Sequence, residues 1–301
     1  MRPRRLIPLI ALVTALAACT TPAEQRAARA SESAAAAAST TTPAPTTTPA
    51  RVTTTTTAEP EPTTTAPPPP ARWVVGAKPL PLGPGGFGQI LPTPAELRDR
   101  RLPTQDRLPP PAGSGYKSTI SPVPADVLAR STWRSGCPVA VADLRYLTMS
   151  FWGFDGLHHT GEMIVHRSAA QGVVGVFGTL HAIRFPIEEM RVTDAPELDL
   201  HPTGDGNNTG SFVCRPAVNQ KTWSAHASGL AIDVNPFNNP YVRGNLVLPE
   251  LASAYVDRGW KRAGMIHRGD AVVRAFAGIG WSWGGDWTSP LDIQHFTATG
   301  R

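Results

Sequence analysis

One set of apolar residues recurs at helical spacing in the middle of the chain. The residues on this face are Val173, Val174, Phe177 and Leu180. Residues three and four apart lie on the same side of a helix, so the spacing predicts a helix over 169–182 with one buried face. The preceding Ser168-Ala-Ala-Gln171 has the form of a capping box, which predicts where the helix starts.

Other segments are either short apolar runs or alternate between apolar and polar residues, as strands do. Strands are predicted at 161–166, 185–192, 229–235 and 293–297. A second helix is predicted over 271–277, because Asp270 can cap its first turn and Gly278 can end it. Strands and helices that do not alternate as regular βαβ units indicate an α+β fold.

The N-terminal quarter lacks this patterning. All 8 Trp, 4 Tyr and 9 Phe follow residue 72, so a packed core is possible only beyond that point. Residues 20–72 are mostly Thr, Pro, Ala and Ser. Such a segment cannot bury enough apolar surface to offset its ordering entropy, so we predict a disordered tether. A low-complexity tail without function is the alternative interpretation.

Residues 73–120 are intermediate in character, because they are rich in Pro and Gly but contain aromatic residues. We predict an extended arm with one helix at 94–101, for which Thr93 would be the N-cap. The sequence leaves open whether this arm is ordered. The folded domain is predicted over 121–301.

The chain begins with the features of a secretory signal, predicted at 1–18. Three arginines precede an apolar run that is shorter than the roughly 20 residues of a membrane-spanning helix. The run ends Leu16-Ala-Ala-Cys19, which resembles the bacterial lipobox. This resemblance implies cleavage before Cys19 and a lipid on its thiol, so that 19–72 is a lipid-anchored tether. An ordinary signal cut after Ala18 is the alternative.

Charge and cysteine usage add two constraints. Removing the signal leaves 25 basic and 23 acidic residues, so the net charge falls from +5 to +2 and gives no support for a nucleic-acid partner. Cys137 and Cys214 remain once Cys19 is assigned to lipid. In an exported protein two remaining cysteines can pair in only one way, which predicts a Cys137–Cys214 disulfide. Two buried thiols are the alternative.

The candidate chemistry lies in two segments that are distant in the sequence. The first contains His226 and, seven residues later, Asp233, which points away from the apolar face of its predicted strand. The second contains Asp292 and His295. Two imidazoles and one carboxylate are a common ligand set for a catalytic zinc. We predict one Zn²⁺ bound by His226, Asp233 and His295.

A zinc site that hydrolyses peptides at neutral pH also needs a proton acceptor and a cation near the reacting carbonyl. Asp292, three residues before His295, is the candidate general base. Arg215 is the candidate cation for the oxyanion or a substrate carboxylate. Ser224, Arg215 and Asp286 are the candidate substrate-binding residues. The alternatives are a salt bridge or cap for Asp292, a surface ion pair for Arg215 and a structural hydrogen bond for Asp286.

The first motif, Ser224-x-His-x-x-Gly-x-Ala-x-Asp233, resembles the signature of the zinc D-alanyl-D-alanine carboxypeptidase family. This family includes vancomycin-resistance-type D,D-peptidases and L-alanyl-D-glutamate endopeptidases. Its second motif places an acid before a histidine, as Asp292 and His295 do. Three more segments resemble one branch of the family, at 207–209, 212–216 and 239–242. The resemblance covers about 131–296.

The resemblance implies the zinc ligands and base named above, with Arg215 near the substrate. It implies a small antiparallel sheet with flanking helices, the zinc fold shared with hedgehog-type domains. It also implies a carboxypeptidase that hydrolyses D-alanyl-D-alanine in peptidoglycan stem peptides, held in the cell-wall space outside the cytoplasmic membrane. A monomer is expected.

One departure from the family leaves other functions open. Many D,D-carboxypeptidases of the family carry Glu-x-x-His or Glu-x-Trp-His as the second motif, whereas Asp292-Ile-Gln-His295 is closer to the endopeptidase branch. An endopeptidase that cuts within the stem is therefore one alternative. A zinc-containing module that binds wall peptides without cutting them is another, although such a module would not need a base at Asp292.

The remaining histidines and tryptophans fit no familiar site. His158, His159 and His166 are interpreted as surface or sheet residues, and His201 as a loop residue. Three tryptophans near the second motif are interpreted either as core residues or as the wall of a glycan or peptide groove. They are Trp281, Trp283 and Trp287.

Overall fold

The computed structural model describes residues 73–218 and 220–300 of the chain. The predicted signal peptide, Cys19 and the predicted tether lie outside the described residues. Within the described part, no helix is both long and apolar enough to cross a membrane. Helices and small antiparallel sheets together give the α+β class that the hydrophobic pattern predicts.

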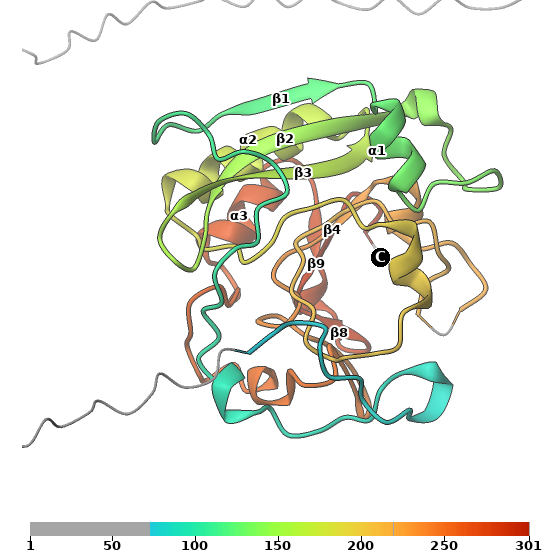
Figure 1. Cartoon of the computed structure of the whole chain (residues 1–301), viewed down its shortest axis with the longest axis vertical. Coiled ribbons are helices and arrows are strands. Elements are labelled where there is room, and N and C mark those ends of the chain that lie inside the picture. Colours follow the sequence, from blue (N-terminus) through green and yellow to red (C-terminus); the bar gives the residue numbers. More distant parts are fainter. Residues whose placement is uncertain (1–72, 219, 301) are drawn as a thin grey trace, which may run out of the picture. The chain divides into compact units, whose positions relative to one another are not determined.

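The longest strands form a three-stranded antiparallel sheet in the order β1-β2-β3. Strand β1 spans Ser118–Ser121, β2 spans Leu144–Trp152 and β3 spans His158–His166. Helix α2, Ala170–Ala182, packs on this sheet and against α3, Ala271–Ala277 (Figure 1). The predicted apolar face of α2 is buried in the main core, which confirms the helical interpretation of its spacing.

Two smaller sheets bring together the segments that carry the candidate chemistry. The first has the order β4-β9-β7, with β4 at Ala231–Asp233, β9 at His295–Thr297 and β7 at Ser282–Trp283. The second has the order β6-β5-β8, with β6 at Leu246–Leu248, β5 at Tyr241–Arg243 and β8 at Leu291–Asp292. All neighbouring strands are antiparallel, and Asp233 lies opposite His295 while Tyr241 lies opposite Asp292.

Short helical segments connect these sheets. Helix α1 spans Ala125–Arg130 and leads into β2 through a loop. The 3-10 segments are Pro84–Gly86, Ala95–Leu97, Val141–Asp143, Ala195–Asp199, Ala225–Ser228, Ser253–Val256 and Gly284–Asp286.

The predicted cap of α3 is present, whereas the predicted cap of α2 is not. Helix α3 has the predicted bounds, and the Asp270 side chain accepts hydrogen bonds from the amides of Val272 and Val273. The capping box before α2 is wrong. Helix α2 has no side-chain cap, because the Ser168 hydroxyl pairs instead with Nδ1 of His166, 2.7 Å away.

The helix predicted at 94–101 is mostly absent. Only Ala95–Leu97 is helical, as a single 3-10 turn. The Thr93 hydroxyl donates to the carbonyl of Leu251 at 2.6 Å instead of capping the turn. This residue therefore joins the arm to the domain.

The strand predicted at 185–192 is wrong. This segment makes isolated bridges, with Pro186 beside Trp152 and Glu189 beside Asn208, but forms no continuous ladder. Proline lacks the N–H that a ladder requires. The other strand predictions are right in position and wrong in length, since β3 begins before 161 and β4 covers only part of 229–235.

The arm at 73–120 is an ordered part of the fold, a question that the sequence left open. Leu80 and Leu97 are buried in a second core cluster with Phe237 and Tyr255. The fully buried Arg100 makes a two-pronged ion pair with Glu188, with both nitrogen–oxygen distances at 2.6 Å. Because a buried charge is stable only when paired, this contact ties the arm to the domain.

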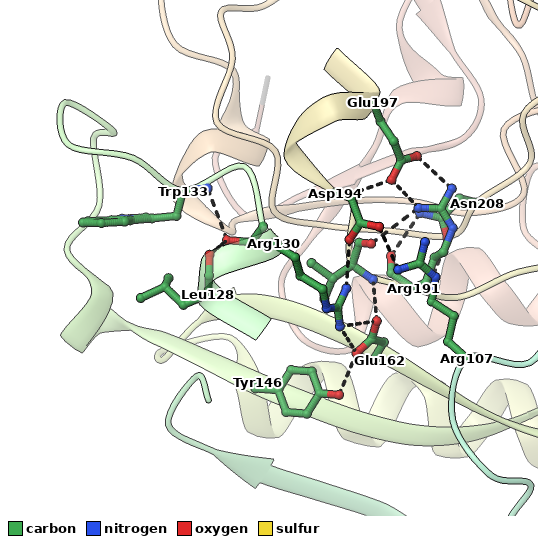
Figure 2. Close-up of polar contacts among 12 residues, drawn as sticks. Arg107, Leu128, Arg130, Trp133, Tyr146, Glu162, Arg191, Asp194, Glu197 and Asn208 are labelled. Carbon is green, nitrogen blue, oxygen red and sulfur yellow. Dashed lines mark hydrogen bonds and ion pairs between the residues drawn. The ribbon is translucent and has the colours of Figure 1, made fainter. Parts of the chain in front are cut away.

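A network of ion pairs joins the arm, α1 and β3 at another point (Figure 2). Arg130 binds both Glu162 and Asp194, and Arg107 of the arm also binds Asp194. The buried Glu162 carboxylate additionally accepts a hydrogen bond from the Tyr146 hydroxyl. The arm is therefore held by charge as well as by apolar burial.

Candidate metal centre

Three side chains converge at the junction between β4, β9 and the 3-10 turn Ala225–Ser228. Nε2 of His226 lies 3.2 Å from Nδ1 of His295 and 3.3 Å from Oδ2 of Asp233. Nδ1 of His295 lies 2.9 Å from Oδ1 of Asp233. The three candidate ligand atoms all lie within 4.8 Å of one another. The structure thus brings together the residues predicted to bind zinc.

The ring of His226 is fixed in one orientation by the backbone. Its Nδ1 lies 2.6 Å from the carbonyl oxygen of Ser211 and must donate a proton to it. Nε2, the other ring nitrogen, then faces Asp233 and His295 and is the atom that would bind a metal. A backbone carbonyl that holds one imidazole nitrogen in this way is the usual support for a metal-ligating histidine.

The sequence motif explains how this geometry forms. The Ser224 hydroxyl accepts a hydrogen bond from the amide of His226 and so caps the 3-10 turn. Gly229 ends the turn with φ of 67°, and a Cβ there would lie 2.5 Å from the backbone nitrogen of His166. Only glycine fits this conformation and this close approach to β3. The next residues can then enter β4, which places Asp233 beside His295.

The charge state of the cluster suits a cation. Burial opposes ionisation of Asp233, but the charges and hydrogen bonds of His226 and His295 outweigh that effect and hold its pKa well below the ordinary value. An ionised carboxylate beside two imidazoles is a donor set that zinc favours. The residues present therefore fit a zinc ion.

Asp292 lies next to this cluster in a different electrostatic setting. Its side chain is 9% exposed, and burial raises its pKa to about 7, with Asp233 adding to the rise and His295 and Arg215 opposing it. Its Oδ1 is fully buried without a hydrogen-bond partner. A Cβ on Gly284 would lie 2.4 Å from the Asp292 carbonyl oxygen. The glycine therefore allows β8, which contains Asp292, to pass close to the 3-10 turn Gly284–Asp286. The result is a carboxyl group poised to exchange protons near neutral pH.

These groups open into one cleft of about 770 Å³. The cleft is lined by His226, Asp233, Asp292 and His295 together with Arg215 and Ser224. Further lining side chains come from Tyr241, Arg243, Glu250, Trp223 and Trp287. A cleft that combines aromatic walls, two cations and a cluster of titratable groups is suited to an extended, charged ligand.

The other predicted site residues lie in different places. Arg215 lines the cleft and its guanidinium donates to the carbonyl of Pro216. Ser224 lines the cleft but uses its hydroxyl as a cap. Asp286 does not line the cleft, and its carboxylate pairs with Arg268 at the surface. The structure thus gives Asp286 a surface ion pair instead of a position on the cleft wall.

The tryptophans and histidines divide in a similar way. Trp281 and Trp283 are buried in the main core, whereas Trp287 lines the cleft and lies near the ring of His295. The sheet interpretation is confirmed for His159, which lies in β3. Its ring is buried between the carboxylates of Asp106 and Asp155.

A disulfide between Cys137 and Cys214 is present, with the two Cα atoms 5.9 Å apart. Cys214 is also held by a hydrogen bond from its amide to the Thr132 hydroxyl. The bond therefore anchors the segment that contains Ser211, which orients His226, and Arg215, which lines the cleft.

The structural support behind the metal ligands was not predicted from the sequence. Asn235 and Asn239 follow Asp233 and are fully buried. The Asn239 side chain donates to the carbonyls of Val234 and Gly264 and accepts from the amide of Ile266. Several asparagines directly after a predicted strand were the available signal, because buried amides must be hydrogen-bonded.

Comparison with known proteins gives one match. Residues 218–298 match the model of a family described as D-alanyl-D-alanine carboxypeptidase. No curated protein and no solved structure matches the chain significantly. The matched range includes His226, Asp233, Asp292 and His295 but begins after Arg215. The match therefore supports the family resemblance for the segment that contains both motifs, a shorter range than 131–296.

Proposed function

We propose that this protein is an exported zinc metallopeptidase that removes the terminal residue from D-alanyl-D-alanine in peptidoglycan stem peptides. One observation carries the proposal. A two-histidine, one-carboxylate cluster and a separate buried carboxyl group share one cleft. The similarity of 218–298 to a D-alanyl-D-alanine carboxypeptidase family supports the choice of substrate.

The residues that would hold zinc are His226, Asp233 and His295. When bound, zinc would polarise the scissile carbonyl and activate a water molecule at neutral pH. The protein's own contribution is to fix these ligands. The Ser211 carbonyl sets the tautomer of His226, and the β4–β9 register holds Asp233 opposite His295.

Proton transfer is assigned to Asp292. Its carboxylate accepts a proton from the attacking water and then delivers it to the amine that leaves. A pKa raised by burial suits both steps, because the group must gain and lose a proton in each cycle. The guanidinium of Arg215 stabilises negative charge on the substrate carbonyl or carboxylate from the cleft wall.

The remaining parts of the proposal concern location. A lipid on Cys19 would hold the protein at the outer face of the cytoplasmic membrane, and 19–72 would act as a tether into the cell wall. The catalytic unit would be a monomer. The location rests on the signal, lipobox and linker composition of the N-terminal sequence.

Mass spectrometry of defined stem peptides after incubation with the zinc-loaded full chain tests the function. We expect loss of one terminal alanine. A cut inside the stem would replace the carboxypeptidase assignment with the endopeptidase alternative. Unchanged peptides, with zinc confirmed in the protein, would overturn the peptidase assignment and favour a wall-binding module.

A further inference from the structure

A buried acidic residue, Glu250, lines the candidate cleft at a distance from the metal centre. It follows β6 and is 6% exposed. Its Oε1 accepts a hydrogen bond of 2.7 Å from the backbone amide of Gly88 in the arm. Neither the proposed zinc ligands nor the proposed base accounts for this carboxylate.

The second carboxylate oxygen of Glu250 is available to a ligand. Across the described residues, Gly88 provides the one hydrogen bond to Glu250, and no Lys, Arg or His side chain lies within ion-pair distance. Oε2 is not one of the fully buried polar atoms that lack a partner, and Glu250 is one of the residues that line the cleft. An acidic group this deeply placed ordinarily has a cationic partner.

The sheet register places Glu250 within reach of the reacting centre. Leu248 and Asp292 both lie opposite Tyr241, in the strands on either side of it. Strands are spaced about 4.8 Å apart, so Leu248 and Asp292 lie on the order of 10 Å from each other, and Glu250 follows Leu248 by two residues. An extended peptide covers that distance in about three residues.

The cleft also carries charge of opposite sign on the other side of Tyr241. Arg243 follows Tyr241 by two residues, on the same side of β5, and lines the cleft. An extended ligand lying along the sheet would meet an acid at one end and a cation at the other. A peptide with a free carboxylate and a free amine has matching charges.

We propose that Glu250 binds a protonated primary amine of the substrate, such as the side-chain amine of a diamino acid near the scissile bond. The inference rests on the proposed function and specifies which stem peptides the cleft accepts. It assigns Glu250 to substrate binding without a role in proton transfer. The hydrogen bond to Gly88 explains the position of Oε1 but leaves Oε2 without a function.

The test compares two stem peptides that differ only in whether a lysine side-chain amine before the terminal D-alanines is free or acetylated. Hydrolysis is measured as kcat and KM for the zinc-loaded full chain. Binding of both peptides is measured by calorimetry in an Asp292→Ala background, so that the result does not depend on hydrolysis. We expect the protein with native Glu250 to prefer the free amine by about tenfold, mainly through KM and Kd.

Three variants make the result specific. Glu250→Gln keeps the acceptor for Gly88 but removes the charge, and should abolish the preference while leaving the acetylated peptide unaffected. Glu250→Asp keeps the charge and should restore part of the preference. Asp205→Asn is the matched control, because buried Asp205 also binds the arm, through Trp73 and Gly76, but does not line the cleft. It should retain the full preference.

Two outcomes would overturn the assignment. One is a protein with native Glu250 that binds both peptides equally or binds neither. The other is a Glu250→Gln variant that keeps the native preference. Preferential binding of the free amine without hydrolysis of either peptide would instead contradict the proposed peptidase activity and leave the role of Glu250 standing.

Discussion

At the scale of single residues, the two carboxyl groups of the site differ because their partners differ. The imidazoles of His226 and His295 hold the pKa of Asp233 low, despite its burial. Asp292 is buried with Oδ1 lacking a partner, so its pKa rises. Two acids whose environments separate their pKa values are suited to separate roles, one as a ligand and one as a base.

This division predicts the behaviour of an Asp292→Ala variant. Removal of a general base should lower kcat on stem peptides by about 10²–10⁴-fold. Zinc content, measured by metal analysis after dialysis, should remain at one ion per chain because all three ligands are intact. His295→Ala is the comparison variant and should lose both zinc and activity. Full activity in Asp292→Ala would show that another group accepts the proton.

At the scale of elements, the motif glycine has a measurable structural role. Gly229 combines a φ of 67° with backbone atoms of β3 within 3 Å of the missing Cβ. Gly229→Ala should destabilise the protein by about 2–4 kcal/mol, because the backbone becomes strained and β3 must shift. Chemical denaturation monitored by circular dichroism gives the change.

Gly175 provides the matched control for that substitution. It lies inside α2 and is exposed, and a Cβ added there would meet no atom within 4 Å beyond the backbone of its own helix. Gly175→Ala should stabilise the protein by about 0.5–1 kcal/mol, since alanine loses less entropy in a helix. Equal effects at the two positions would contradict the explanation given for Gly229.

The same scale shows what sequence could and could not predict. The spacing of Val173, Phe177 and Leu180 identified α2, because burial of one helix face requires that spacing. The cap at Ser168 and the helix after Thr93 were wrong. The Ser168 hydroxyl pairs with the ring of His166 two residues earlier, whereas the Thr93 hydroxyl has a partner, Leu251, that the local sequence does not contain. The motif histidines and carboxylates were identifiable in advance, whereas the Ser211 carbonyl was not, because any residue can supply a backbone oxygen.

At the scale of the molecule, the arm changes the extent of the folded unit. Sequence composition separated 73–120 from the domain, yet Leu97 and Arg100 of the arm are fully buried within it. Isolated apolar residues in a Pro- and Gly-rich region form no periodic pattern, so their burial partners could not be inferred. The arm also supplies the Gly88 amide that holds Glu250 at the cleft.

The ion pairs that hold the arm predict a response of stability to acid. Burial alone would raise the pKa of Asp194, but hydrogen bonds and charges from Arg107 and Arg130 outweigh it and lower that pKa (Figure 2). A carboxyl group with a lowered pKa in the folded state stabilises the fold above its unfolded-state pKa of about 3.9. That contribution is lost as the pH falls through the folded-state value.

An Asp194→Asn variant should therefore be less stable than the native protein at pH 7. Its free energy of unfolding should also fall less steeply as the pH drops below about 4, because the group that gains a proton on unfolding is gone. Denaturation curves at a series of pH values measure both effects. Asp199→Asn is the control, because Asp199 is exposed and has no ion-pair partner among the described residues. Parallel pH dependence for the native protein and Asp194→Asn would show that this network does not couple the arm to stability.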